Sequence, residues 1–150
     1  MVYDLLIRNA SVLDGSGAAH FRADVAIQGE RICAIGDMPY ATATTMIDAE
    51  GRYLTPGFID VHTHDDTNVI RTPEMLPKLT QGITTVVVGN CGISASPVTL
   101  ASEVPDPMNL LGRLEDFRYS SFSAYANAVD AAAPVLTSPP WWGIPVCAAR

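Results

Sequence analysis

Apolar and alternating positions in the first fifty residues predict a series of short β-strands. The runs are separated by turn residues such as Asp14, Gly15 and Gly29. The predicted strands lie at residues 3–12, 23–27, 32–36, 46–48 and 53–54. Apolar runs of this length between Gly and Asp turns are typical of strands. Their number and spacing favour a small β-sandwich or an open barrel, which we place at residues 1–54.

A different pattern begins at residue 55, where strand-like and helix-like segments alternate. Residues 58–61 predict a buried strand, and residues 83–89 predict a second one that is apolar or β-branched at nearly every position. Strands covered on both faces, as in a parallel sheet, have this composition. A polar loop at 65–72 and a helix at 73–81 are expected between them. Strand, helix and strand together predict a βαβ unit with a right-handed crossover.

The ends of two predicted helices are marked by capping residues. For the helix at 73–81, Thr72 is the expected N-cap, and Pro73 takes the first position. Pro77 inside this segment predicts a kink or a later start, because proline cannot donate the backbone hydrogen bond. A second helix at 121–133 carries four apolar side chains along one face, which we expect to pack in the core. They are Phe122, Tyr125, Ala126 and Val129.

Candidate chemistry gathers where the two predicted parallel strands end. His62 and His64 lie two residues apart at the end of the first strand, so alternation places both rings on one side. Cys91 follows the second strand, and parallel strands end at the same edge of a sheet. Imidazole and thiolate are typical zinc ligands. The sequence therefore predicts a metal site of these three residues, against the alternative of solvent-facing histidines and a small buried cysteine.

Several other polar residues lie near this predicted site in the sequence. Asp60 shares the predicted face of the histidines, so its carboxylate could accept a ring N–H of a ligating histidine as a second-layer partner. Alternatively, a lysine or arginine from another strand neutralises it, and both options stay open. Asp65 and Asp66 directly follow the pair and could reach the site, but acidic loop residues are most often solvated, and we expect that here. We expect no metal role for His20.

Composition excludes some classes of binding partner and indicates a cellular location. The formal net charge of −7, with no basic cluster, argues against nucleic acid and against an anionic membrane as partners. No apolar run approaches the roughly 20 residues of a membrane-spanning helix. The three cysteines do not form a disulfide framework, so we predict a reducing, cytoplasmic location.

Three motifs resemble a known group of enzymes. The run TPGFIDVHTH at 55–64 resembles the opening metal motif of the amidohydrolase superfamily. The runs QGITTVVVGNCGIS at 81–94 and PMNLLG at 107–112 are similar to those of N-acyl-D-amino-acid deacylases (D-aminoacylases). The resemblance covers roughly residues 1–133. The G-N-C-G element is its most discriminating part.

The resemblance implies a fold and an activity. The fold is a small N-terminal β-sandwich followed by the first βα units of a TIM-like (β/α)8 barrel, at residues 55–134. His62, His64 and Cys91 would bind one or two Zn²⁺ ions, with the cysteine able to bridge two metal positions. The reaction would be hydrolysis of the amide bond of an N-acyl-D-amino acid, a small-molecule substrate. The catalytic general base of such enzymes, an aspartate, comes from a later strand and is expected beyond this chain.

The chain also departs from that family. A complete barrel takes about 250 residues, and no histidine follows His64. We therefore expect a truncated, incomplete barrel with an unpaired sheet edge and an uncovered apolar face, and no hydrolysis by the chain alone. Residues 135–150 contain two adjacent prolines and both tryptophans, a composition that cannot form a central strand. For this segment we predict translation out of frame or from a misjoined gene.

Two other functions remain as alternatives to the deacylase. One is a cyclic-amide hydrolase of the dihydroorotase or hydantoinase type, which instead bridges its metals with a carboxylated lysine. The other is a non-catalytic zinc-binding or vestigial fragment.

Overall fold

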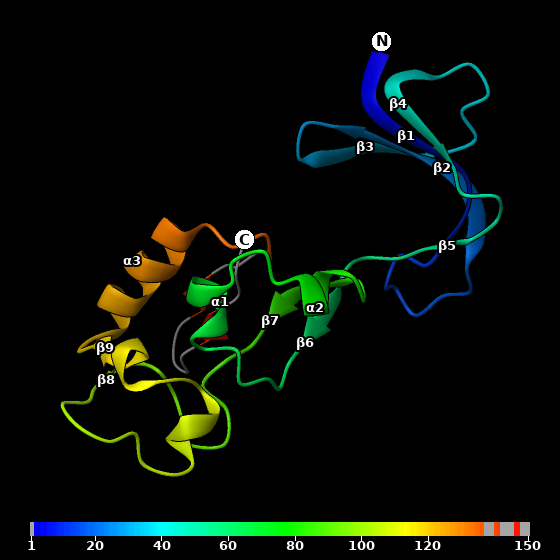
Figure 1. The fold of residues 1–150 in the computed structure, drawn as a ribbon. Helices are drawn as coiled ribbons and strands as arrows, with labels where there is room; N and C mark the ends of the chain where they lie inside the picture. The colour runs from blue at the N-terminus through cyan, green and yellow to red at the C-terminus, as the bar shows by residue number, and fades with distance from the viewer. Residues whose placement is uncertain (1, 137–139, 142–145, 148–150) are drawn as a thin grey trace. The chain divides into compact units, whose positions relative to one another are not determined.

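The computed structural model of the chain describes residues 2–136, 140–141 and 146–147 (Figure 1). The chain divides into two compact units, Met1–Pro56 and Gly57–Arg150. Among the described residues, no helix has both the length and the apolar character needed to cross a membrane.

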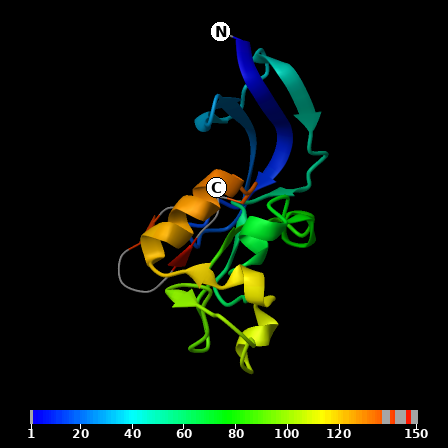
Figure 2. The same cartoon turned by 60° about the vertical axis from the view of Figure 1, so that its left-hand side comes forward.

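The first unit consists of one mixed five-stranded sheet. The strands are β1 (Val2–Val12), β2 (Phe21–Gln28), β3 (Arg31–Gly36), β4 (Thr42–Asp48) and β5 (Tyr53–Leu54). The order is β3-β2-β1-β4, and β5 also pairs with β1. β1 is antiparallel to β2 and parallel to β4, and these strands run side by side in Figures 1 and 2. The predicted β-rich character of this segment is confirmed.

The number of layers in the first unit differs from the prediction. A sandwich needs two packed sheets, whereas β4 and β5 both extend the sheet along β1. The predicted β-sandwich is therefore wrong for these residues, which form a single sheet. Its core contains Ala10, Val12, Ala23, Val25 and Ala49. Apolar side chains elsewhere on the sheet, such as Ile32 and Met46, are 64% and 52% exposed.

The second unit combines short elements with long connecting loops. Its order is β6 (Phe58–Asp60), α1 (Asn68–Arg71), α2 (Leu76–Leu79), β7 (Ile83–Val86), β8 (Val98–Thr99), the 3-10 turns η1 (Met108–Leu110) and η2 (Leu114–Asp116), β9 (Arg118–Tyr119), α3 (Phe122–Ala132), β10 (Pro140–Trp141) and β11 (Val146–Cys147). β6 and β7 are parallel, which confirms the predicted pairing. The β8–β9 and β10–β11 pairs are antiparallel.

The helix predicted at 73–81 is wrong in its extent. α2 covers only Leu76–Leu79, and Thr72 lies at the C-terminal end of α1 instead of capping α2. A helix that began at Pro73 would place Pro77 in its second turn, where the missing N–H breaks the helix. With a start at Leu76, Pro77 falls in the first turn, where no donor is required. The predicted loop at 65–72 likewise contains the short helix α1.

The first strand of the βα segment is not buried as predicted. Phe58 and Ile59 are 57% and 62% exposed. Among the described residues, β6 pairs with β7 alone, so one edge of this pair and the apolar side chains of β6 stay open to solvent.

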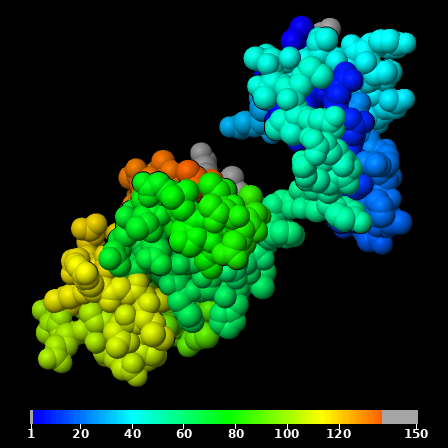
Figure 3. Space-filling model, turned by 45° about the vertical axis from the view of Figure 1, so that its right-hand side comes forward, coloured from blue at the N-terminus to red at the C-terminus, as the bar shows by residue number. Residues whose placement is uncertain are grey.

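α3 supplies much of the core of the second unit. Ser121 accepts a hydrogen bond from the backbone N–H of Ala124 and caps the helix. Tyr125 and Val129 are buried and pack in one cluster with Val86 of β7. The predicted helix and its core-facing side are confirmed for these two residues, whereas Phe122 is 37% exposed. In Figure 3 the green to orange part of the chain forms one continuous body.

The predicted anomalous tail at 135–150 falls mostly outside the described residues. Residues 137–139, 142–145 and 148–150 are not described. The structure does not test the predicted out-of-frame origin of this segment, which stays a prediction.

Candidate metal centre

The two histidines lie in the loop that follows β6. β6 ends at Asp60, so His62 and His64 are not part of the strand and the alternation argument does not apply to them. Their rings nevertheless lie close together in an edge-to-face arrangement, with centroids 5.9 Å apart and planes at 77°. His62 is exposed and His64 is partly buried.

Cys91 reaches the histidines from a sharp turn after β7. Gly89, Cys91 and Gly92 have φ angles of +80°, +58° and +75°. Glycine adopts this left-handed region freely, whereas a residue with a side chain is strained there. The turn places Sγ of Cys91 2.9 Å from Nε2 of His62. One ligand atom from each of His62, His64 and Cys91 lies within 4.8 Å of the others.

The donor set is chemically suited to a divalent ion of intermediate softness. Two imidazole nitrogens and one thiolate sulfur are common zinc ligands, and three protein ligands leave a coordination position free. Nδ1 of His64 is buried and has no hydrogen-bond partner. A buried polar atom without a partner destabilises the folded state. A metal ion bound to this ring would remove that cost, so His64 fits the role of a ligand. Because Cys91 and His62 are exposed, the group is open to solvent.

Thr63, between the two histidines, fixes the loop to its surroundings. Its backbone carbonyl accepts a hydrogen bond from the side-chain amide of Asn90, at 3.2 Å. Its backbone N–H donates to the carbonyl of Val87 at 3.4 Å, and its hydroxyl donates to Asp65 at 2.5 Å. Asn90 directly precedes Cys91 in the chain. The bonds that join Thr63 to Asn90 and Val87 therefore connect the loop of the histidines to the segment that carries the thiol.

Lys78 of α2 decides between the two options for Asp60. Its ammonium donates to Oδ2 of Asp60 at 2.6 Å, while Oδ1 accepts the backbone N–H of His62 at 3.2 Å. The carboxylate is thus neutralised by a lysine, which comes from a helix rather than from another strand. The hydrogen bond from Lys78 is the main reason why the pKa of Asp60 is lowered. No hydrogen bond joins Asp60 to an imidazole ring.

The two acidic residues after the histidines are not solvated as predicted. Asp65 accepts hydrogen bonds from Thr63 and Asn68 and forms an ion pair with Lys78 at 3.1 Å. Burial raises the pKa of Asp65, but these hydrogen bonds outweigh it, so the pKa is lowered. Asp66 is only 1% exposed. Burial is the main reason that its pKa is raised.

Asp66 owes its burial to contacts with distant parts of the second unit. Its carboxylate accepts the backbone N–H of Ala95 at 3.2 Å, and its carbonyl accepts the hydroxyl of Tyr125 at 2.7 Å. Ala95 lies in the chain segment that follows Cys91, and Tyr125 lies on α3. Sequence reasoning had no means of finding these contacts, because they join residues far apart in the chain.

The residues that support the site were missed by sequence reasoning, although weak signals existed. Lys78 is the only lysine of the chain. Asn90 lies in the G-N-C-G element, and Thr63 separates the histidines. Thr63 and Asn90 are polar residues directly beside candidate ligands in the sequence. The partners of all three residues, however, become visible only in the three-dimensional structure.

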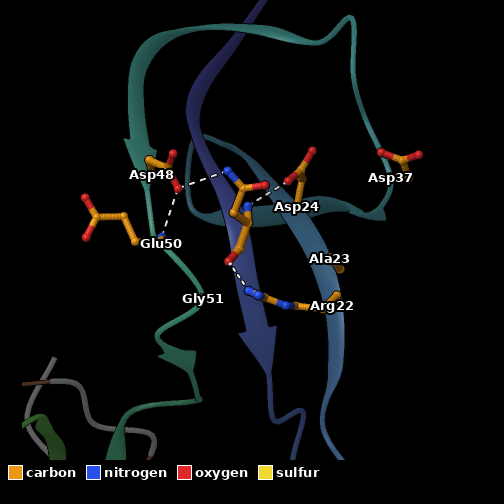
Figure 4. A pocket seen from close by; sticks show the side chains of 8 residues that line it. Arg22, Ala23, Asp24, Asp37, Asp48, Glu50 and Gly51 are labelled. Atoms are coloured by element: carbon orange, nitrogen blue, oxygen red, sulfur yellow. Dashed lines mark hydrogen bonds between the residues drawn. The ribbon is translucent and has the colours of Figure 1, made fainter.

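The first unit contains a pocket of a different character. Figure 4 shows its lining, in which Asp24 and Asp48 accept hydrogen bonds from the backbone N–H and the side-chain amide of Asn9. The guanidinium of Arg22 donates to the carbonyl of Asn9. These polar groups are therefore engaged with the protein itself. His20, also in this unit, contacts the ring of Tyr53, and it is not part of the metal-ligand group found among the described residues.

Comparison with known proteins finds deacylases among the similar sequences and structures. N-acyl-D-aspartate deacylase of Alcaligenes xylosoxydans xylosoxydans is 48% identical over 84% of this chain and 25% of its own length. A crystal structure of D-aminoacylase matches 89% of this chain and 28% of its own, with a TM-score of 0.84 and 43% identity. N-acyl-D-glutamate deacylase from Bordetella bronchiseptica, crystallised with zinc and a phosphonate inhibitor, has a TM-score of 0.81 and 42% identity over 89% of this chain and 28% of its own.

These matches cover only part of the relatives. The chain spans about a quarter of the length of the curated relatives it matches. The model of the amidohydrolase family matches residues 45–138, which include all three candidate ligands. The resemblance to amidohydrolases and D-aminoacylases noted in the sequence is confirmed. Since the family model matches more than half of its residues, the chain belongs to the amidohydrolase family.

Proposed function

We propose that this chain carries the first metal ligands of a zinc-dependent N-acyl-D-amino-acid deacylase. The observation that carries the proposal is the convergence of His62, His64 and Cys91 within 4.8 Å. The relatives described above support it, because they are deacylases and one of them was crystallised with zinc. The substrate class is an N-acyl-D-amino acid, and the reaction is hydrolysis of its amide bond. One zinc ion is sufficient for these three ligands, and Cys91 is the ligand suited to bridging a second.

The chain's own residues hold and orient the site. His62 and His64 each offer a ring nitrogen, and Cys91 offers a thiolate once it has lost its proton. Asn90 and Thr63 hold the two loops together through their hydrogen bond. When bound, the ion supplies polarisation of the scissile carbonyl and activation of water. Among the described residues, the ligand group consists of two imidazoles and a thiol and contains no carboxylate.

The fold that we propose around the site is the beginning of a (β/α)8 barrel. The parallel pair β6–β7, with the short helices α1 and α2 between the two strands, has the order of a barrel βα unit. The division of the chain at Pro56 and Gly57 supports a separate N-terminal β-domain. The TM-score of 0.84 with a D-aminoacylase structure supports both parts. The predicted cytoplasmic location and the expected lack of nucleic-acid and membrane partners stay predictions.

Metal analysis of matched variants tests the proposed ligands. Purified chain is loaded with zinc, dialysed and analysed, beside His62→Ala and Cys91→Ala. The chain offers matched controls in its first unit, namely His20→Ala and Cys33→Ala. We expect wild type and both controls to retain zinc and the two ligand variants to lose it. Equal zinc content in all five proteins would contradict the proposed site, provided that circular dichroism shows them equally folded.

A chimeric enzyme tests the proposed reaction. Residues 1–133 replace the matching N-terminal segment of a D-aminoacylase, and hydrolysis of N-acetyl-D-amino acids is measured. We expect turnover that is lost when Cys91→Ala is introduced. A folded, zinc-containing chimera without activity would contradict the deacylase function and favour the non-catalytic zinc-binding alternative. Cyclic amides serve as the comparison substrates, although the three relatives above do not favour that alternative.

The isolated chain offers a further test, in which zinc binding and hydrolysis are measured separately. The chain spans about a quarter of the length of its deacylase relatives, and we expect the isolated 150-residue chain to bind zinc without hydrolysing N-acetyl-D-amino acids. Zinc-dependent turnover by the purified chain, abolished by Cys91→Ala, would contradict this expectation.

A further inference from the structure

Lys78 occupies a central position next to the candidate metal centre without touching a ligand. Its side chain is 22% exposed. Its ammonium has three oxygen partners: Asp60 at 2.6 Å, Thr63 at 3.0 Å and Asp65 at 3.1 Å. Asp60 and Thr63 accept hydrogen bonds from it, and Asp65 forms an ion pair with it.

The three acceptors are distributed along the segment that carries the histidines. Asp60 precedes His62 by two residues, Thr63 stands between the histidines, and Asp65 directly follows His64. One ammonium group therefore contacts the segment before, between and after its two candidate ligands. Such a contact fixes the conformation of the segment more strongly than any single pair does, because both ends are bound to the same atom.

These contacts also control where the two carboxylates point. Asp60 and Asp65 both direct an oxygen to Lys78, and the other oxygen of Asp60 accepts the backbone N–H of His62. Without the cation, the two like charges would repel each other and would be free to turn toward a metal. With it, the ligand group contains two imidazoles and a thiol and no carboxylate.

We propose that Lys78 is a positioning residue that holds residues 60–65 in the conformation in which His62, His64 and Cys91 converge and both flanking carboxylates contact the lysine. The role in metal binding rests on the proposed function, whereas the role in shaping the segment does not. Lysine suits this role better than arginine, because a compact ammonium meets three acceptors arranged around one point, whereas a guanidinium presents its donors in a plane.

The test compares Lys78→Met, which keeps the length of the side chain without its charge, with Lys78→Arg and with a control. Arg52→Met is the control, because it removes a cation from an exposed ion pair of the first unit, with Glu50. The first readout is amide hydrogen exchange of His62 and Thr63 in the metal-free chain, with the amides of α3 as internal reference. The second readout is zinc affinity, measured by competition with a chelator.

We expect Lys78→Met to speed exchange at His62 and Thr63, to leave α3 unchanged, and to weaken zinc binding about 10–100-fold, as is typical for groups that orient metal ligands. Lys78→Arg should recover part of both effects, and Arg52→Met should show neither. Unchanged exchange at His62 and Thr63 in Lys78→Met would overturn the proposal, and so would exchange that rises equally in α3, since that indicates general unfolding. If wild type binds no zinc, the proposed metal site fails, and the exchange measurement alone decides whether Lys78 shapes the segment.

Discussion

The two units of this chain achieve a defined geometry by different means. In the first unit, β1 is 11 residues long and pairs with three other strands, and Leu6 at its centre is 0% exposed. In the second unit, β6 has three residues, and the loop after it is fixed by the side chains of Asn90 and Lys78. Backbone ladders and apolar packing shape the first unit, whereas individual polar contacts shape the candidate site.

This difference indicates what each unit can do. A regular sheet with a buried apolar centre tolerates no reactive groups in that centre, and the polar groups of its pocket bind one another. A loop held by hydrogen bonds at a few points leaves adjacent side chains free to converge on a ligand. The contrast predicts that the stability of the first unit and the zinc affinity of the second respond to different substitutions.

The largest expected effect is a loss of stability of the first unit after a core substitution. Leu6→Ala removes a fully buried side chain from β1, and we expect a loss of about 2–5 kcal/mol in the free energy of unfolding, as for other large-to-small core substitutions. Zinc affinity should stay as in wild type. Urea unfolding and chelator competition measure the two quantities. A parallel loss of zinc affinity in the folded variant would show that the units are coupled.

The next effect concerns pH and is confined to the second unit. Burial lowers the pKa of Lys78, but hydrogen bonds to Asp60 and Asp65 outweigh it, so the pKa is raised above its ordinary value of 10.5. A raised pKa in the folded state stabilises the protein fully below 10.5, and this contribution is lost as the pH rises through the folded pKa. The pKa of Asp60 is lowered, so its contribution to stability depends on pH in the opposite sense. Its contribution is present above 3.8 and is lost as the pH falls through its folded pKa.

The stability difference between wild type and Lys78→Met should therefore be largest between these limits. We expect a difference of about 1.5–3 kcal/mol near neutral pH, the range for hydrogen bonds to charged groups. It should shrink in strong acid and in strong alkali. Denaturant unfolding at a series of pH values measures it. A difference that stays the same from neutral pH into alkali strong enough to deprotonate Lys78 in the folded chain would contradict the assignment of the effect to the charge of Lys78.

A smaller effect is expected at Cys91 itself. Its φ of +58° is unfavourable for any residue with a side chain, by about 1–2 kcal/mol. Cys91→Gly should therefore be more stable than Cys91→Ala by about 1 kcal/mol, although both lose the thiol. Thermal unfolding of the two metal-free variants measures the difference. Equal stability would show that the turn relaxes without strain.

The sequence predicted the first unit better than the second, and the reason is physical. Long apolar runs between glycine turns specify strands locally, so β1 to β3 were found nearly to their ends. Whether such strands form one sheet or two depends on pairing between distant residues, and the predicted sandwich failed for that reason. The helix at 73–81 failed because Pro77 is tolerated only in a first turn.

For the candidate site, the sequence predicted the ligands but not their support. Parallel pairing of β6 and β7 was sufficient to bring Cys91 near His62, even though the histidines lie beyond the strand. The contact between Lys78 and Asp60 depends on where α2 begins, and the sequence misplaced that start. Burial of Asp66 depends on Ala95 and Tyr125, and no local pattern links these residues.

The most direct test of the central claim is X-ray absorption spectroscopy of the zinc-loaded chain. The account predicts one sulfur ligand at about 2.3 Å and nitrogen ligands at about 2.0–2.1 Å. The sulfur should vanish in Cys91→Ala and remain in Cys33→Ala. A spectrum with only oxygen and nitrogen ligands in the wild-type chain would contradict the assignment of Cys91, and with it the proposed metal centre.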